Sequence, residues 1–94
     1  MDIHNEPTMA FDQLAAETAP YRVLAGAKQM RKTIQKGKAH KVYLARNADP
    51  ALIQPLLALC QEYSVSVAWV KSMTDLGHIC GIEVGAAAAV AVKN

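Results

Sequence analysis

Short apolar runs with the composition typical of buried β-strands recur along the chain. Each run is rich in Val, Ala, Leu or aromatic residues, and each has polar or turn-forming neighbours. Such residues fit the pleated, half-buried surface of a sheet. The last run also contains helix-favouring alanines, but its β-branched end favours a strand lined by small residues. We therefore predict four strands, at YRVLA (21–25), HKVYLA (40–45), VSVAWV (65–70) and AAAAVAV (86–92).

The segments between these runs show helical spacing and helix-capping residues. Four helices are predicted, at FDQLAAET (11–18), 27–36, 50–63 and 73–80. Asp49 and Ser72 can cap the third and fourth helices, and Gly37 and Gly81 can end the second and fourth. Pro55 lies inside the third helix, which is therefore either kinked there or regular only from that residue on.

Helices and strands alternate from residue 11 to the C-terminal end of the sequence. This order is typical of a sheet that is at least partly parallel and lies between helices. Residues 1–10 have no apolar periodicity and are expected to form a loose tail. We accordingly divide the sequence into an acidic N-terminal tail (1–11) and a single domain (12–94).

Charge is distributed unevenly along the chain. The net charge is +2, but residues 1–20 hold four acids and no Lys or Arg, whereas residues 21–46 hold eight of the ten Lys and Arg residues and no acid. Such segregation indicates a surface that binds a polyanion. The alternative is an ordinary solvated helix face, which would usually mix in acids.

The helix predicted over 27–36 has two features that favour anion binding. Its inner face is expected at Ala27, Met30 and Ile34. The outer face carries Lys28, Lys32 and Lys36, whose mutual repulsion weakens an isolated helix and would be relieved by bound phosphates. Gly26 precedes the helix without a capping side chain, which leaves backbone N–H groups for an anion, and Gln29 adds an amide able to contact a base edge. The alternative for Gly26 is an ordinary turn.

Several classes of protein are disfavoured by the sequence. The chain lacks ~18 consecutive apolar residues and a signal peptide, so we expect a cytoplasmic protein with no membrane partner. Cys60 and Cys80 have no zinc-ligand spacing and are expected to be reduced core residues. No metal or cofactor is predicted.

No catalytic constellation is evident either. Asp75, His78 and Cys80 share one short helix without a third orienting group, and they fit a half-exposed helix with incidental polar residues better. Glu83 has no assigned role. Trp69 is interpreted as a core residue, with a stacking platform as the alternative. The protein is therefore expected not to be an enzyme.

Three stretches, taken in order, are similar to a known family. GAKQMRK, ARNADP and VAWVKSMTDLGHICGIEVGAA resemble the kink-turn-binding family of large-subunit ribosomal proteins seven-Ae and thirty-e, above all its small bacterial members. The similarity covers roughly residues 20–92, and LGHICGIEVGAA is its most specific part. The resemblance implies a three-layer α/β/α sandwich with a central mixed four-stranded sheet.

The resemblance also implies binding of kink-turns, which are sharply bent RNA internal loops with tandem sheared G·A pairs. The helix that begins after Gly26 would enter the RNA groove, with Lys28 and Gln29 facing guanine edges and Lys32 reaching phosphate or base. Archaeal and eukaryotic members usually carry Asn-Glu in place of Lys28-Gln29. Including Lys36 for its charge, the predicted RNA-binding residues are Gly26, Lys28, Gln29, Lys32, Lys36, Arg46, Val70, Lys71 and Ser72.

The expected protein is thus a monomeric RNA-binding protein whose partner is structured RNA: a kink-turn, ribosomal RNA or leader RNA, with the ribosome as a further partner. Two alternatives stay open. The first is a general ribosomal RNA or ribosome-assembly protein without kink-turn specificity. The second is a protein-interaction module that docks through the alanine-rich edge or the acidic tail.

Overall fold

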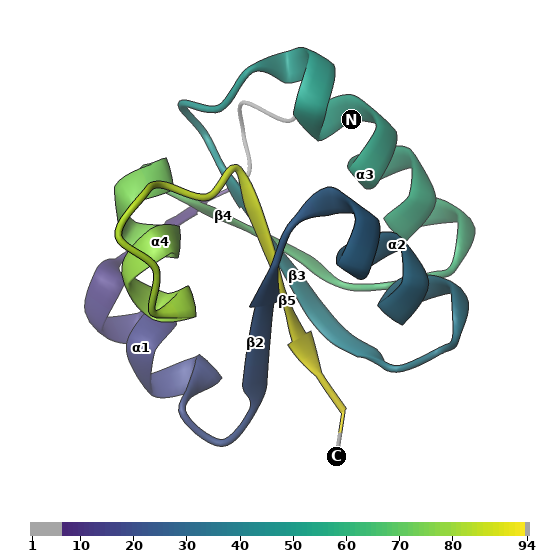
Figure 1. Ribbon diagram of the computed structural model, residues 1–94, viewed down its shortest axis with the longest axis horizontal. Helices are drawn as coiled ribbons and strands as arrows, with labels where there is room; N and C mark the ends of the chain where they lie inside the picture. The colour runs from purple at the N-terminus through teal and green to yellow at the C-terminus, as the bar shows by residue number, and fades with distance from the viewer. Residues whose placement is uncertain (1–6, 94) are drawn as a thin grey trace.

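Five strands of the described residues form one mixed sheet at the centre of the fold (Figure 1). The computed structural model describes residues 7–93. Across the sheet the strand order is β1-β4-β3-β5-β2; β1, β4 and β3 run parallel, and β5 is antiparallel to both β3 and β2. The strands are β1 (Thr8–Met9), β2 (Arg22–Ala25), β3 (Ala39–Ala45), β4 (Val67–Val70) and β5 (Ala88–Val92).

Helices cover both faces of this sheet. The helices are α1 (Phe11–Thr18), α2 (Ala27–Gln35), α3 (Pro50–Glu62) and α4 (Met73–Cys80). Helix α2 packs beside α3 on one face, and α1 packs beside α4 on the other (Figure 1). The predicted three-layer α/β/α sandwich is therefore confirmed. None of the helices within the described residues is long and apolar enough to span a bilayer.

The first strand corrects the sequence prediction, which placed four strands in the sheet and a loose tail over 1–10. Thr8 lies opposite Trp69 and Met9 opposite Val70, so β1 pairs with the outer edge of β4. A two-residue strand is too short to show a periodic pattern in the sequence. It forms because the neighbouring edge of β4 offers free N–H and C=O groups. Residues 1–6 of the predicted tail lie outside the described residues.

The other elements begin and end close to the predicted positions. Helix α3 is continuous from Pro50 to Glu62 across Pro55, so the interpretation that it is regular only from Pro55 was wrong. The Asp49 carboxylate explains the early start, because it accepts a hydrogen bond from the Ala51 N–H at 2.9 Å. Ser72 caps α4 as predicted, and Gly81 ends that helix in the left-handed conformation.

The inner face of α2 differs from the predicted face at one position. Met30 and Ile34 are fully buried, but Ala27 is exposed. Thr33 is buried in its place, and its hydroxyl donates to the Gln29 carbonyl at 2.9 Å. Ala27 is the first residue of α2, next to the open start at Gly26, and the buried face begins one turn later at Met30.

The two cysteines are free thiols, as expected. Cys60 is fully buried on the inner face of α3, and burial raises the pKa of its thiol to about 11. Cys80 is only half-buried, so it is a core residue in part, and burial raises the pKa of its thiol as well.

Candidate nucleic-acid interface

Strands β2, β3 and β4 end, and strand β5 begins, at one edge of the sheet. Neighbouring residues there are paired in register, Ala25 with Ala89, Leu44 with Ala88 and Ala45 with Val70. Helix α2, the β3–α3 turn and the β4–α4 loop all begin at this edge, and the α4–β5 loop returns to it. We call it the upper edge. It gathers the predicted binding residues, except Lys36 at the far end of α2.

Hydrogen bonds hold the loops of the upper edge together. The Arg46 N–H donates to the Val70 carbonyl at 2.9 Å, and the Met73 N–H donates to the Asn47 side-chain oxygen at 2.9 Å. The Ala86 N–H in turn donates to the Met73 carbonyl at 2.9 Å. The three loops therefore form one connected surface.

Gly26 gives α2 an open start. Its backbone has φ 102° and ψ 125°, and no side chain among the described residues caps the helix after it. A Cβ at this position would have no heavy atom within 4 Å, so the space above Gly26 is free. The free N–H groups and the positive end of the helix dipole thus face open space, which suits an anionic ligand.

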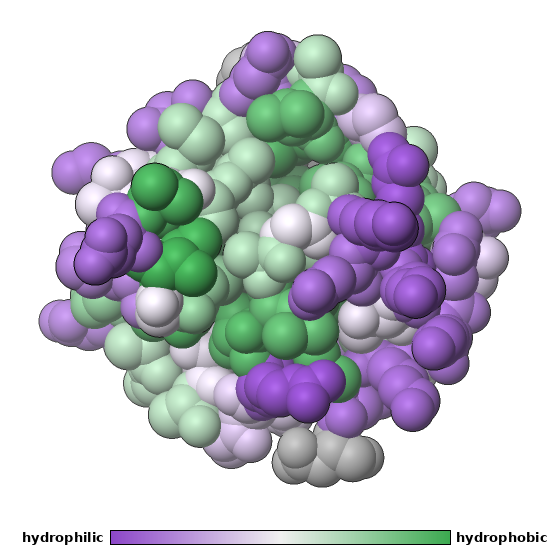
Figure 2. Space-filling model, in the orientation of Figure 1, coloured by the Kyte–Doolittle hydropathy of each residue, from purple (hydrophilic) through white to green (hydrophobic). Residues whose placement is uncertain are grey.

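The exposed face of α2 carries the predicted basic residues. Lys28, Gln29 and Lys32 are exposed, and so is Lys36 just after the helix. Figure 2 shows hydrophilic side chains gathered over this helix. None of the three lysines forms an ion pair with another described residue. Their positive charge is therefore not neutralised within the described part of the protein.

The β4–α4 loop offers one exposed cation. Lys71 is exposed, whereas the Val70 side chain is only 1% exposed and belongs to the core. The half-buried Ser72 hydroxyl accepts the Asp75 N–H at 3.2 Å. Of the three residues predicted here, Lys71 is thus available to a ligand through its side chain, while Val70 and Ser72 hold the loop in place.

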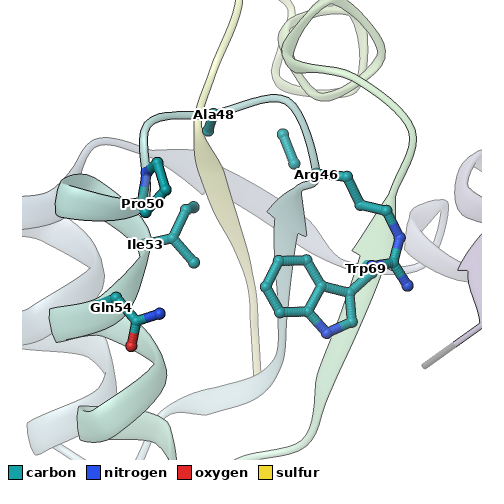
Figure 3. Close-up of a pocket in the computed structure, with 7 residues that line it drawn as sticks. Arg46, Ala48, Pro50, Ile53, Gln54 and Trp69 are labelled. Carbon is teal, nitrogen blue, oxygen red and sulfur yellow. The ribbon is translucent and has the colours of Figure 1, made fainter. Parts of the chain in front are cut away.

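Arg46 is turned away from α2. Its guanidinium lies over the Trp69 ring, 5.3 Å from the ring centroid, and its Nε donates to the Thr8 hydroxyl. Figure 3 shows both side chains beside a cavity of about 380 Å³, with Ile53 and Gln54 across it. Trp69 is 6% exposed, so its interpretation as a core residue is confirmed.

A second cavity, which sequence reasoning missed, lies beside the start of α2. Its volume is about 270 Å³, and its lining is largely apolar: Ala25, Gly26, Ala27, Leu52, Leu56, Gly85, Ala86, Ala87 and Ala88. Figure 2 shows apolar surface between α4 and α2. The run of small residues from Gly85 to Ala88 was the available signal, but the part played by Leu52 on α3 could not be read from the sequence.

Two glycines hold one wall of this second cavity against α4. A Cβ on Gly77 would lie 2.3 Å from the Val84 carbonyl oxygen, and one on Gly85 would lie 2.9 Å from the Met73 Cβ. Both positions lack room for a larger side chain. The α4–β5 loop can therefore pack closely on α4, which fixes the wall formed by Gly85 and Ala86.

The described residues contain no group of three or more His, Cys, Asp and Glu side chains that could hold a metal ion. His78, considered above with Asp75 and Cys80, is exposed and makes an edge-to-face contact with the Phe11 ring at 6.3 Å between ring centroids. This contact links α4 to α1. It accords with the interpretation of His78 as an incidental polar residue.

Comparison with known proteins adds independent information. Residues 10–94 match the model of the ribosomal protein L7Ae/L30e/S12e/Gadd45 family. The chain belongs to this family. The resemblance in the sequence motifs is thereby confirmed.

Bacterial relatives of this L7Ae-family chain cover most of its length. A protein of Caldanaerobacter subterraneus subsp. tengcongensis is 35% identical over 77 residues, which span 82% of this chain and 94% of the relative. A protein of Bacillus pumilus is 38% identical over 80 residues, spanning 85% and 94%. Both carry the name RNA-binding protein. These names and the family agree with the prediction that the L7Ae-family chain is not an enzyme.

Solved structures share the fold. The 15.5 kD RNA-binding protein of Giardia lamblia matches with a TM-score of 0.78 and 22% identity, covering 100% of this chain and 85% of that one. A Bacillus halodurans protein of unknown function matches with a TM-score of 0.68 and 28% identity, covering 86% and 78%. The first likeness supports the L7Ae-family fold alone.

Proposed function

We propose that this protein binds structured RNA at the upper edge of its sheet and recognises kink-turns there. The observation that carries the proposal is the uncapped start of α2, which lies next to an exposed row of lysines and an apolar cavity. Backbone N–H groups and lysines suit phosphates. An apolar cavity suits an unstacked base. A sharply bent RNA presents both to one surface.

Residues on α2 are proposed to contact the paired part of the bend. Gly26 lets the RNA approach the backbone, because the space above it is free. Lys28 and Gln29, both exposed, face the edges of the sheared G·A pairs, and Lys32 reaches a phosphate or a base. Lys36 contributes charge.

Residues of the other loops are proposed to hold the nucleotides outside the stack. Lys71 contacts a phosphate next to the unstacked base, and Arg46 contacts the RNA backbone from the β3–α3 turn. Val70 and Ser72 act through the loop that they support. The second cavity takes the base itself, because its largely apolar lining and volume of about 270 Å³ suit a flat ring.

Wider features of the proposal rest on the family and on the sequence. The names of the bacterial relatives favour RNA as the partner. We infer a cytoplasmic, monomeric protein associated with the ribosome, in which the RNA-binding domain comprises residues 12–94 together with β1 and the first residue of α1. The same upper edge would bind a leader RNA, if a leader RNA and not ribosomal RNA is the partner.

The deciding experiment compares two RNAs. One is a kink-turn, and the other carries Watson–Crick pairs in place of its tandem G·A pairs. We expect the protein to bind the kink-turn more tightly, and the double variant Lys28→Gln/Lys32→Gln to lose that preference. Equal binding of both RNAs would instead support the general ribosomal RNA-binding function, and no RNA binding would favour the protein-interaction module.

A charge-matched variant controls for net charge. Gln13 and Ala16 are exposed on α1, on the opposite face of the sheet from α2. The double variant Gln13→Glu/Ala16→Glu lowers the net charge by two, as the lysine variant does. We expect it to keep the preference for the kink-turn. Loss of the preference in both variants would show that the α2 lysines act only through net charge.

A further inference from the structure

A second group of cations lies at the opposite edge of the sheet, where β2 and β3 begin and β5 ends. The group belongs to three separate parts of the sequence. We call it the lower basic surface, and its members are Arg22, Lys36, Lys38 and Lys93.

The strand pairing brings these residues together. Arg22 lies opposite Val92, and Val92 also lies opposite Ala39 across β5. The Lys93 N–H donates to the Lys38 carbonyl at 2.8 Å. Cations near the start, middle and end of the sequence therefore converge on one edge.

The charges of this surface are open to a ligand. All four side chains are exposed, and none forms an ion pair with another described residue. A hollow of about 180 Å³ beside Lys93 is lined in part by His40 and Tyr63. Glu62 ends α3 next to Tyr63, and Glu17, which is paired with Lys41, lies near His40. The four cations outnumber the one unpaired acid among these residues, so the local charge stays positive.

The lower basic surface continues from the upper edge. Lys28, Lys32 and Lys36 follow each other along α2, whose nine residues span about 14 Å. Figure 2 shows hydrophilic side chains over α2 and at the lower edge of the protein. At physiological salt, charges interact over only about 8 Å through water. The lower cations therefore add little to the affinity for a ligand that stays at the upper edge. Only a ligand that extends to the lower edge would gain affinity from them.

We propose that the lower basic surface binds the phosphate backbone of a double-helical RNA stem that leaves the upper edge along α2. The inference rests on the proposed function, because the stem belongs to the RNA bound there. Lys and Arg contacts to phosphates position a duplex without reading its sequence. The upper edge thus recognises the bend, and the lower basic surface holds one of the two stems beside it.

The test uses three kink-turn RNAs and the variant Lys38→Gln/Lys93→Gln. One RNA has two stems long enough to pass the end of α2, and in each of the other two RNAs a different stem is cut back to the pairs next to the bend. For the long RNA we expect about tenfold weaker binding by the variant, and a salt slope smaller by about 1.4 to 1.8, since each of the two lost phosphate contacts contributes roughly 0.7 to 0.9. For one shortened RNA the variant should bind like the unchanged protein.

The control is again Gln13→Glu/Ala16→Glu, which changes net charge equally on the far face. We expect it to bind all three RNAs like the unchanged protein. If Lys38→Gln/Lys93→Gln binds the long RNA with unchanged affinity, the lower basic surface has no role in holding a stem. The same conclusion follows if this variant and the control both lose affinity equally for every RNA. The kink-turn proposal stands in either case. If the unchanged protein shows no preference for the kink-turn, both proposals are wrong.

Discussion

Individual residues at the upper edge have two separable properties, backbone conformation and side-chain charge. Gly26 contributes only the first. Its φ of 102° is strained for any residue with a Cβ, and the space above it is empty. Lys28 and Lys32 contribute only the second, because both are exposed on a regular helix. Substitutions at these positions therefore test different parts of the proposed binding surface.

Gly26→Ala is expected to affect both stability and binding. The strained backbone should lower the free energy of unfolding by about 1 to 3 kcal/mol. The new methyl group also occupies the space through which RNA approaches, so affinity for a kink-turn should fall by about tenfold, or about 1.4 kcal/mol. Urea denaturation and RNA titration of the same preparation measure the two effects.

The matched control is Gly37→Ala. Gly37 has φ 73°, also faces open space and lies just after α2, away from the upper edge. This substitution should cost about 1 to 2 kcal/mol of stability, with affinity nearly unchanged for a kink-turn RNA whose stems do not reach the lower basic surface. An equal loss of affinity in both variants would mean that destabilisation, and not contact at Gly26, explains the effect.

Among the helices, α1 is anchored to the sheet by one carboxylate. Glu17 accepts hydrogen bonds from the Lys41 ammonium at 2.6 Å and from the Tyr43 hydroxyl at 2.9 Å. Burial favours a higher pKa for Glu17, but the hydrogen bonds from Lys41 and Tyr43 outweigh it and leave the pKa below its ordinary value. Burial, followed by the bond to Glu17, raises the pKa of Tyr43. Helix α1 is therefore held by a charged group that acid can neutralise.

Glu17→Gln should change the response of the protein to acid. Because the folded-state pKa is lowered, the ionised carboxylate stabilises the fold above the unfolded-state pKa of about 4.3. That contribution disappears as the pH falls through the lower folded-state pKa. The variant should be less stable near pH 7 by roughly 1 kcal/mol or less, and the difference should vanish in acid.

Urea denaturation from pH 7 to pH 3 measures this difference. Glu62→Gln is the control, since the exposed Glu62 forms no ion pair with another described residue. A Glu17→Gln variant whose stability stays parallel to that of the unchanged protein at every pH would show that the carboxylate charge does not hold α1.

Across the protein, the cations of α2 and of the two sheet edges lie apart from the acids of α1, although Asp49 and Glu62 lie at the two ends of α3. The basic residues line α2 and the two edges of the sheet, whereas Asp12 and Glu17 lie on α1, on the opposite face. The whole basic surface is therefore able to face one polyanion. Arg46 and Lys41 are exceptions, because Arg46 lies over Trp69 and Lys41 is paired with Glu17.

RNA binding by the complete protein should depend steeply on salt. Contacts from Lys28, Lys32 and Lys71 predict a slope of about −2 to −3 for log K against log salt concentration, with the lower basic surface, Lys36 included, adding to it on long stems. Titrations with a kink-turn RNA over a range of salt concentrations measure the slope. A flat profile would contradict phosphate binding by these lysines.

Most of the fold could be predicted from local patterns. Strand and helix positions follow from apolar spacing, and the ends of α3 and α4 follow from Asp49, Ser72 and Gly81, because caps act within one turn of the backbone. The resemblance to the family depended on the same local stretches. These features could be predicted because each depends on residues that are adjacent in the sequence.

Other features depend on contacts between distant residues and appear only in three dimensions. Strand β1 needs the free edge of β4, the apolar cavity needs Leu52 from α3 beside Gly85, and Arg46 turns toward Trp69 and Thr8. The lower basic surface likewise needs Lys93 beside Lys38. The order of residues specifies which chemical groups are present and which local structures they form. Strand pairing and packing decide which of those groups meet, because each such contact joins segments that are far apart along the chain.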